Sequence, residues 1–358
     1  MKILDKNILV IDGSFGEGGG SIIRLSAGYS ILFDRPIKIF NIRANRSKPG
    51  LRLQHLLGLK TLARITNSKL SNCDIGTNEI IFEPIKENIE KKIDVKITTA
   101  ASIGLLLQPI QIACLGFHQP TTLEISLEGG GTIGKWAPGL NYLKNVTYQI
   151  FKNTNYNIDI DIHKYGFYPK GGARTVCNID IPREELKSIE LTELGNIDLV
   201  KGQIVCSEKL KNAKVLERIK SSIEKKIKEK IEIDTDIYFE YVKSLSIGVG
   251  LSLWANSDNG AIISSGTMLG EKNISSEELG NKAADKLINY IRNEIPVDNY
   301  LSDQLIPIMG YIRKPSKIKV LEITNHTKTN LELIKHFTNR EYFIDKKENH
   351  TIIELHQE

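Results

Sequence analysis

Hydrophobic positions follow a helical period in some segments and a strand period in others, in an order that returns three times along the chain. The first unit has a helix, a strand, a second helix and two short strands: Ser21–Leu32, Pro36–Arg43, Leu51–Ile65, Lys69–Cys73 and Glu79–Phe82. The second unit repeats this order over Ser102–Leu115, Thr121–Leu127, Pro138–Lys152, Tyr156–His163 and Ala173–Ile181. The third unit repeats it over Ser276–Asn293, Ile318–Thr324, Thr327–Phe337, Glu341–Ile344 and Thr351–Leu355. Because strands separated by helices need crossover connections, we expect an α/β (α+β) fold of three small mixed sheets, each covered on one face by two helices.

A stretch of about ninety residues between the second and third units, Glu184 to Lys272, does not follow this order. It contains an amphipathic helix at Ala213–Lys230 and strands at Glu232–Lys243 and Ser246–Ala255, which indicate an inserted small α/β domain. We therefore expect residues 1–183 to hold the first two repeats of a large domain, 184–272 the insert and 273–358 the third repeat. Ten Lys or Arg against four Glu between positions 201 and 230 indicate either a solvated helix face or a binding surface for a polyanion.

Length and composition exclude several classes of protein. A chain of 358 residues with 41% hydrophobic residues is neither a disulfide-stapled mini-protein nor a disordered chain. Its net charge of +5 is compatible with a nucleic-acid substrate but is far from that of a histone-like protein. The four cysteines lie too far apart for a disulfide framework or a cysteine zinc site.

No segment is predicted to target the protein to a membrane. The first thirteen residues have the pattern of a short strand interrupted by polar residues, not the continuous apolar core of a signal peptide. The most apolar stretch, Ala101–Phe117, is shorter than the roughly 20 residues that a membrane span needs. We therefore expect a soluble, cytoplasmic protein with no membrane partner.

The first segment with candidate chemistry is the glycine-rich loop DGSFGEGGGS at 12–21, between a strand and a helix. Glycines let the backbone approach a ligand closely, and the amides that open the next helix favour an anion. The loop matches neither the dinucleotide fingerprint nor the phosphate loop that ends in Gly-Lys-Ser/Thr, and a glycine run alone would be a flexible connector. Its single acid, Glu17, favours a functional interpretation, because this carboxylate can reach a divalent ion or a proton.

The second segment is basic. Arg43, Arg46, Lys48 and Arg52 fall within ten residues, and a Pro-Gly pair breaks the chain before the next helix. Arginines in a loop suit bidentate recognition of phosphate, and an exposed basic turn is the alternative.

The third segment, NYLSDQL at 299–305, precedes an apolar stretch that is predicted to be helical. Ser302 or Asp303 can cap that helix, which is sufficient as a structural explanation. The functional alternative is that Tyr300 stacks on a base while Asp303 and Gln304 bind a ribose or a base edge.

The fourth segment contains His326, where a strand meets a helix that we expect Thr327 to cap. A lone His is usually structural or merely exposed. The position favours function, because a phosphate at the N-terminus of the following helix would face the imidazole.

Five motifs make the chain resemble the RNA 3′-terminal phosphate cyclase family. In that family's order they are GEGGG, RAxRxKPGLxxQH, GFYPKGG at 166–172, YLxDQ and HxxTN, and together they span nearly the whole chain. The resemblance implies three repeats similar to the C-terminal domain of translation initiation factor three, plus a small inserted α/β domain.

The resemblance also implies a reaction in which ATP, with Mg²⁺ or Mn²⁺, converts an RNA 3′-phosphate end to a 2′,3′-cyclic phosphate. The residue that matches the family's nucleophile, His326, would become covalently linked to AMP. AMP would then pass to the RNA 3′-phosphate, and the adjacent 2′-hydroxyl would close the ring and release AMP. Such covalent catalysis divides one hard condensation into easier displacements.

The remaining site residues are implied by their positions in the same motifs. Glu17 corresponds to the family's metal-binding acid. The expected nucleotide contacts are Gln108, Pro138, Tyr300, Leu301, Ser302, Asp303 and Gln304. Arg24, Arg43 and Arg46 are expected to bind phosphate or RNA, with Arg52 and Gln54 as further candidates.

Two departures from the family pattern concern the second repeat. Ile133 stands where the family usually has Asp, and Asn141 where an acid is common, so contacts to the RNA end are expected to differ there. The main alternative is a non-catalytic relative, a scaffold or endonuclease-like factor in ribosomal RNA processing. Such relatives lack the nucleophilic His and much of the nucleotide motif, both of which this chain has.

A small-molecule transferase built on a related fold is a third hypothesis, and it would not require His326. The physiological RNA, the preferred metal and the oligomeric state stay open, and a homodimer is among the states that the sequence allows.

Overall fold

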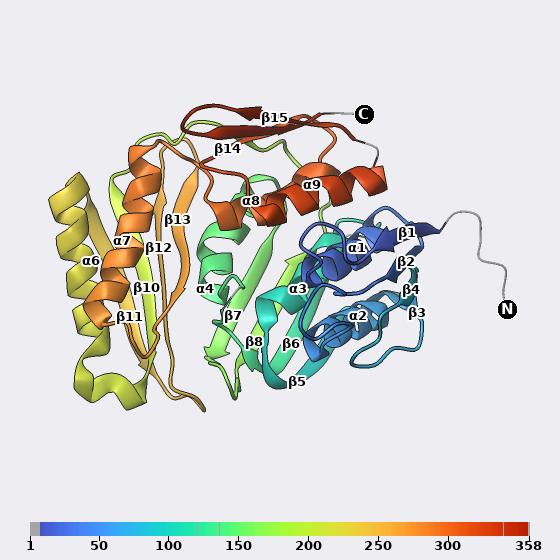
Figure 1. Cartoon of the computed structure of the whole chain (residues 1–358), viewed down its shortest axis with the longest axis horizontal. Coiled ribbons are helices and arrows are strands. Elements are labelled where there is room, and N and C mark those ends of the chain that lie inside the picture. The colour runs from blue at the N-terminus through green and yellow to red at the C-terminus, as the bar shows by residue number, and fades with distance from the viewer. Residues whose placement is uncertain (1–7, 120, 136, 339, 357–358) are drawn as a thin grey trace.

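The computed structural model describes residues 8–356 apart from residues 120, 136 and 339, and Figure 1 shows how its elements are arranged. In this part of the chain there are four sheets of four strands each. The strand expected within the first thirteen residues is β1, Leu9–Asp12, and positions 1–7 of that prediction lie outside the described residues. Three of the sheets share one topology: their first two strands are parallel, and the fourth strand lies between the second and the third, antiparallel to both.

The first unit is a sheet with two helices. Its strands, in sheet order, are β1 (Leu9–Asp12), β2 (Ile37–Phe40), β4 (Ile80–Glu83) and β3 (Lys69–Leu70). Helix α1 (Gly20–Leu32) joins β1 to β2, and α2 (Leu53–Thr66) follows β2. α1 is buried along nearly its whole length because it packs against α2, α3 (Ile103–Cys114) and α9 (Asn325–Thr338). The glycine-rich loop that precedes α1 therefore opens at the centre of the molecule.

The second unit has the strand order β5 (Lys92–Ser102), β6 (Thr122–Gly131), β8 (Arg174–Asp180) and β7 (Ile158–Lys164). Helix α3 follows β5, and a longer helical segment follows β6. That segment consists of α4 (Leu140–Tyr142), a π-helical turn (Leu143–Thr147) and α5 (Tyr148–Asn153).

Strand β5 is absent from the sequence prediction, in which this unit begins with its first helix at Ser102. Ile93, Val95 and Ile97 are buried, and the residues between them are exposed. This alternation is typical of a strand with one solvated face, but it is short and follows a run of charged residues.

The third unit has the strand order β9 (Glu190–Leu191), β14 (Ser316–Val320), β16 (Thr351–Leu355) and β15 (Tyr342–Lys346). Its helices are α8 (Asn299–Tyr311) and α9. Because β9 pairs with β14 across more than a hundred residues, the insert interrupts the third unit after its first strand.

The insert has the strand order β11 (Asp234–Val242), β10 (Leu199–Ser207), β12 (Val249–Asn256) and β13 (Ile262–Leu269). A 3₁₀ helix (Glu208–Ala213) leads into α6 (Val215–Ile231), and α7 (Ser276–Arg292) packs beside α6 against this sheet, at the left of Figure 1.

The grouping of α7 corrects the sequence prediction, which made Ser276–Asn293 the first helix of the third unit. That role belongs to α8, which packs against α9 and β14. The apolar stripe of α7 includes Leu279, Ala283 and Leu287, all buried. An amphipathic stripe predicts that a helix exists but does not say which sheet it covers, and here it covers β12 and β13 of the insert.

The expected mixed α/β architecture of small sheets is confirmed, and the likeness to translation initiation factor three stays a prediction. Among the helices of the described part of the chain, none combines the length and the apolar character that crossing a bilayer requires.

Candidate active site

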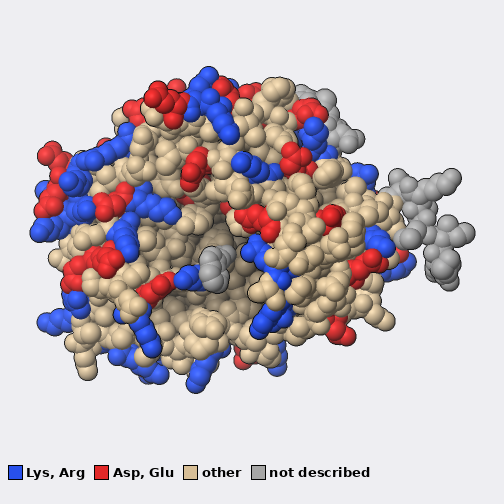
Figure 2. All heavy atoms as spheres, viewed as in Figure 1, with Lys and Arg blue, Asp and Glu red and all other residues tan. Residues whose placement is uncertain are grey.

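Five helices contribute side chains to one cavity of about 360 Å³. Its lining comes from α1, α3, α7, α8, α9 and the loop before α4: Ser21, Arg24, Leu105, Gln108, Ala137, Pro138, Lys286, Asn299, Tyr300, Asp303, Gln304, Thr324, His326 and Asn330. A hollow in the centre of the face drawn in Figure 2 has Lys and Arg atoms along its border. Segments far apart in the sequence therefore share one polar cavity.

His326 lies in the first turn of α9, and its side chain is half exposed, at 51%. The hydroxyl of Thr324 accepts a hydrogen bond from the Thr327 backbone N–H at 2.9 Å, so Thr324 acts as the N-terminal cap. The prediction that Thr327 caps this helix is wrong, because the helix begins two residues earlier, at Asn325.

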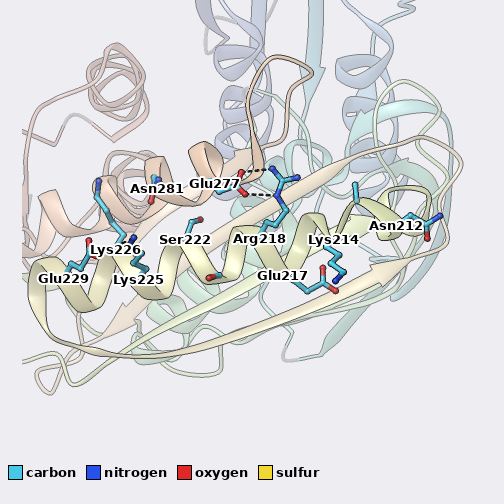
Figure 3. A pocket seen from close by; sticks show the side chains of 12 residues that line it. Asn212, Lys214, Glu217, Arg218, Ser222, Lys225, Lys226, Glu229, Glu277 and Asn281 are labelled. Carbon is cyan, nitrogen blue, oxygen red and sulfur yellow. Dashed lines mark hydrogen bonds and ion pairs between the residues drawn. The ribbon is translucent and has the colours of Figure 1, made fainter.

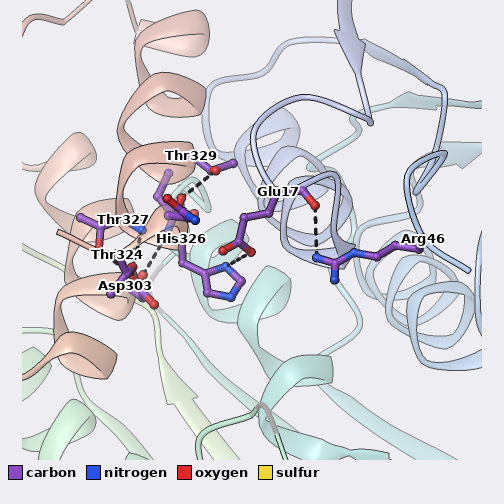
Figure 4. Close-up of polar contacts among 9 residues, drawn as sticks. Glu17, Arg46, Asp303, Thr324, His326, Thr327 and Thr329 are labelled. Carbon is purple, nitrogen blue, oxygen red and sulfur yellow. Dashed lines mark hydrogen bonds and ion pairs between the residues drawn. The ribbon is translucent and has the colours of Figure 1, made fainter.

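Glu17 and His326 are in direct contact, as Figure 4 shows. Glu17 Oε2 lies 2.8 Å from His326 Nδ1, and the Glu17 side chain is only 19% exposed. An ionised carboxylate at this position accepts the Nδ1 proton, which leaves the lone pair of Nε2 available. This arrangement orients the ring and fixes its tautomer, as a nucleophilic imidazole requires.

The loop that carries Glu17 is held against α9 and the basic segment. Arg46 Nη2 donates to the Glu17 carbonyl oxygen at 3.1 Å. Gly16 has a φ of +55° and lies so close to Thr329 that a Cβ atom there would collide with it. The glycines therefore let the carboxylate approach the helix that bears His326.

Asp303 lies on α8 and holds the start of α9. Its Oδ1 accepts hydrogen bonds from Thr327 Oγ1 at 2.7 Å and from Thr324 Oγ1 at 3.0 Å. Burial raises the pKa of Asp303, whereas the Thr327 hydrogen bond and the charge of His326 oppose that shift. Asp303 thus connects α8 to the helix that positions His326.

The start of α8 also differs from the prediction that Ser302 or Asp303 caps it. Asp298 is the cap: its Oδ1 accepts from the backbone N–H groups of Tyr300 at 2.9 Å and Leu301 at 3.1 Å. The helix therefore begins with this segment, at Asn299. Its first turn places Leu301 in the core and leaves Ser302 Oγ 3.2 Å from Thr327 Oγ1.

Arg24 supplies a cation without a counter-anion. Its Nε donates to Gln108 Oε1 at 3.1 Å, and among the described residues the guanidinium has no other hydrogen bond and no ion pair. Burial lowers the pKa of Arg24 to about 10, so the group stays protonated near neutral pH. A cation left unpaired in a cavity favours an anionic ligand.

Lys286 was not found by the sequence analysis. It reaches the cavity from α7 of the insert, with its Nζ 3.1 Å from the Tyr300 hydroxyl and 4.3 Å from the ring centroid. No motif marks this lysine. Only its contact with Tyr300 of α8 identifies it, and the sequence prediction had grouped α7 differently.

Three polar atoms at the cavity are buried without a hydrogen-bond partner among the described residues: Ser21 Oγ, Asn299 Oδ1 and Asn330 Oδ1. A buried polar atom left unsatisfied typically costs about 1–3 kcal/mol. Their concentration at one cavity indicates that a polar ligand or water completes their hydrogen bonds.

The arginines of the basic segment lie beside the cavity and not in its lining. Arg43 Nη1 donates to the carbonyl oxygens of Lys48 at 2.7 Å and Gly50 at 2.9 Å, which stabilises the turn. Burial, together with the charges of Arg24, Arg43 and Arg52, lowers the pKa of His55 to about 3. This region is therefore electropositive and holds His55 neutral.

The two departures from the family pattern have structural roles. Ile133 is buried among Tyr165, Phe167 and Val205, and Asn141 is buried and accepts a hydrogen bond from the Tyr165 hydroxyl at 3.1 Å. Ile133 therefore belongs to an apolar cluster, whereas Asn141 takes part in a buried hydrogen bond.

Among the residues that the structure describes, no group of three or more His, Cys, Asp or Glu side chains is placed to hold a metal ion. Glu17 is a single carboxylate beside a cavity that contains cations. This arrangement fits an ion such as Mg²⁺, which is commonly bound by one or two carboxylates together with phosphate oxygens of the substrate.

Comparison with known proteins gives matches over nearly the full length. A family model described as RNA 3′-terminal phosphate cyclase matches residues 15–344. A protein named RNA 3′-terminal phosphate cyclase from Thermococcus onnurineus is 34% identical over 341 residues, covering 95% of this chain and 96% of that protein. Proteins of the same name from Pyrobaculum aerophilum and Methanopyrus kandleri are 34% and 33% identical over 346 and 336 residues. These alignments cover 96% and 92% of this chain, and 97% and 93% of those proteins.

Proposed function

This chain belongs to the RNA 3′-terminal phosphate cyclase family, and from that premise we propose that it uses ATP to convert an RNA 3′-phosphate end to a 2′,3′-cyclic phosphate through an AMP linked to His326. The observation that carries the proposal is the 2.8 Å contact between Glu17 Oε2 and His326 Nδ1 at the edge of a cation-bearing cavity. We also propose that the protein acts in the cytoplasm.

In the first step Nε2 of His326 attacks the α-phosphorus of ATP. A P–N bond forms, the bond to the bridging oxygen breaks, and pyrophosphate leaves with the electron pair. Glu17 keeps the proton on Nδ1 and stabilises the positive charge that the ring gains. Nε2 has no partner among the described residues, so nothing in that part of the chain competes for its lone pair.

In the second step an oxygen of the RNA 3′-phosphate attacks the adenylate phosphorus, and the P–N electron pair returns to Nε2. The 2′-hydroxyl then attacks the activated 3′-phosphorus, which closes the ring and releases AMP. A protein that carries out both steps needs cations around the phosphorus atoms. Arg24 is a cation of the cavity that has no ion pair among the described residues, and we assign Arg43 and Arg46 to the incoming RNA phosphate.

The nucleoside portion of ATP is assigned to the end of the cavity formed by α3, α7 and α8. Tyr300 is 40% exposed and offers a ring for stacking, with Lys286 beside it. Gln108, Pro138, Asp303 and Gln304 also line this cavity. Leu301 and Ser302 are fully buried, and we assign them the role of holding α8 in place.

A bound Mg²⁺ or Mn²⁺ would neutralise charge on the phosphates, with Glu17 as its protein ligand. Glu17 would hold the ion through its carboxylate, one oxygen of which lies 2.8 Å from His326 Nδ1.

Incubation with α-labelled ATP and Mg²⁺ or Mn²⁺ tests the proposal. We expect acid-labile label on the wild-type protein and none on His326→Ala. In the presence of RNA, only strands that end in a 3′-phosphate should become resistant to phosphatase. A wild-type protein that takes no label would support the non-catalytic alternative, and equal modification of 3′-hydroxyl ends would indicate another ligase-like reaction.

A further inference from the structure

A hollow between α6 and α7 contains charges that are largely compensated by ion pairs. It has a volume of about 750 Å³ and contains part of the basic run of the insert. Figure 3 shows that Arg218 forms two hydrogen bonds to Glu277, at 2.7 and 2.8 Å. Lys226 pairs with Asp285 at 2.9 Å. Because these cations already pair with acids of α7, we favour the interpretation of the basic run as a solvated helix face. A binding surface for a polyanion would leave its cations unpaired.

A second groove, on the solvent face of the β5-β6-β8-β7 sheet, has a different charge pattern. One cross-strand row runs Lys96, Glu128, Arg174 and Lys164, and all four side chains are exposed. We call the hollow of about 600 Å³ around this row the Arg174 groove, defined by Lys96, Glu128, Lys164, Gly172, Arg174 and Leu245.

The cations of the Arg174 groove lack partners. Within the described residues Lys96, Lys164 and Arg174 have no ion pair, and Arg174 has no hydrogen bond from its side chain, although Glu128 is its cross-strand neighbour. An adjoining hollow of about 310 Å³ adds Lys243 and one acid, Glu240. Cations therefore outnumber acids on this surface, and their charges stay available for an anion.

An exposed aromatic ring lies in the turn that leads into Gly172 of the groove. Tyr168, in the turn of the GFYPKGG motif, is 78% exposed, and Leu245 is 51% exposed. The turn is fastened to the neighbouring loop, because the Lys170 backbone N–H donates to Ser246 Oγ at 3.0 Å and Gly172 lies against Leu245. Exposed aromatic rings next to unpaired cations are the combination that binds single-stranded nucleic acid, by base stacking and phosphate attraction.

The same turn is continuous with a wall of the catalytic cavity. Gly166 and Gly171 lie against the Gly130 carbonyl oxygen, where a Cβ atom would collide. The Thr132 N–H donates to the Gly166 carbonyl oxygen at 3.0 Å, and the chain continues from there to Pro138 in the cavity lining. The turn is thus packed against Gly130 and Thr132, and Pro138 of the cavity lining follows six residues after Thr132 in the sequence.

We propose that the Arg174 groove and Tyr168 bind the upstream nucleotides of a single-stranded RNA whose 3′-phosphate end occupies the His326 cavity. The inference rests on the proposed function, since it assigns a binding surface to the same substrate. In this proposal the cavity binds the terminal phosphate, and the groove binds the nucleotides on its 5′ side.

The test compares two double variants with the same change of net charge. Lys164→Gln with Arg174→Gln removes two cations of the groove, and Lys225→Gln with Lys228→Gln removes two exposed cations of α6. Fluorescence anisotropy measures binding of a 20-nucleotide RNA and a 3-nucleotide RNA, both with 3′-phosphates, at several salt concentrations. The groove variant is expected to bind the long RNA roughly tenfold more weakly, with a salt slope smaller by about 1.4, and to bind the short RNA normally. The α6 variant should match the wild type.

Tyr168 is tested by Tyr168→Ala against Tyr168→Phe, which keeps the ring. The Ala variant is expected to lose about tenfold in affinity for the long RNA, and the Phe variant less than twofold. Labelling with ATP alone should be equal in all these proteins, which shows that the cavity is intact. Unchanged binding of the long RNA by the groove variant, or equal losses for both RNA lengths, would overturn the inference. Absence of ATP labelling in the wild type would instead overturn the proposed function. The anisotropy measurement would still show whether the Arg174 groove binds RNA.

Discussion

The contact between Glu17 and His326 joins two residues that lie more than three hundred positions apart. Sequence patterns marked both residues, one as an acid among glycines and the other at the start of a helix. What the sequence could not give is their pairing, because the resemblance assigned Glu17 to a metal ion. The structure adds that the same carboxylate orients the imidazole.

Substitution Glu17→Gln tests the charge of this contact. The amide oxygen can still accept the Nδ1 proton, but it no longer stabilises a positive ring. Because a hydrogen bond to a charged group is worth about 1.5–3 kcal/mol, the initial rate of ATP labelling should fall about 10- to 100-fold. A labelling rate equal to that of the wild type would show that Glu17 does not act on the ring.

His55 gives a prediction for the pH dependence of stability. It is 3% exposed, its Nδ1 accepts from the Arg52 backbone N–H at 3.1 Å, and its pKa falls from 6.5 to about 3 on folding. Between these two values the unfolded chain binds a proton that the folded chain does not. The stabilising contribution of His55 is therefore complete above pH 6.5 and is lost as the pH falls towards 3.

Between pH 7 and pH 5 the loss from His55 amounts to about 2 kcal/mol in the free energy of unfolding. His55→Gln keeps an acceptor for Arg52 but removes the titration, so its free energy of unfolding should decrease by about 2 kcal/mol less over this interval. Urea unfolding of both proteins at the two pH values measures the difference. An identical pH dependence in both proteins would contradict the neutral state of His55.

At the scale of elements, the sequence predicted most helices and strands, because periodic apolar positions are a local property. It placed the glycine loop before α1 and His326 at the start of α9. It missed β5, whose alternation follows a dense run of charges, and also β9, β10 and β13, and it grouped α7 with the wrong sheet. The grouping of α7 failed for another reason: a local pattern shows that an element has an apolar face but not what that face contacts.

The N-terminal cap of α8 is Asp298, and it positions the first turn of this helix at the cavity. Asp298 is fully buried, and besides capping α8 it accepts a hydrogen bond from the Tyr142 hydroxyl at 3.0 Å. Burial raises its pKa to about 6, against the hydrogen bonds that lower it. The segment that we assign to the nucleotide is thus positioned by a residue outside the family motif.

Asp298→Ala should lower the free energy of unfolding by about 2–4 kcal/mol, because it removes the cap and leaves the Tyr142 hydroxyl without its acceptor. Asp298→Asn keeps an acceptor for both partners and should cost less than half as much. Chemical unfolding monitored by circular dichroism separates the two variants. Equal losses would mean that the negative charge, and not the hydrogen bonding, stabilises α8.

At the scale of the whole molecule, the three units contribute different groups to one cavity: Glu17 and Arg24 from the first, Gln108 from the second, and His326 from the third. The insert adds Lys286. This convergence could not be read from the sequence alone, since it depends on how the units pack and not on any one unit's pattern.

Lys286→Ala tests whether the insert takes part in nucleotide binding. Loss of a cation over the Tyr300 ring is expected to raise the KM for ATP about five- to tenfold, with little change in stability. Lys282→Ala is the matched control, because Lys282 lies one turn earlier on α7, is half exposed and pairs with Glu278. An equal effect of the two substitutions would remove Lys286 from the site.

The proposed reaction requires that His326 accepts the adenylyl group. Peptide mapping after a single turnover with ATP identifies the residue that carries AMP directly. The protein is digested at neutral pH, and the modified peptide is identified by mass spectrometry. We predict one AMP per chain, on the peptide that contains His326, with none on Glu17→Ala at the same early time point. AMP on any other residue, or undiminished adenylylation of His326→Ala, would contradict the assignment of His326 as the nucleophile.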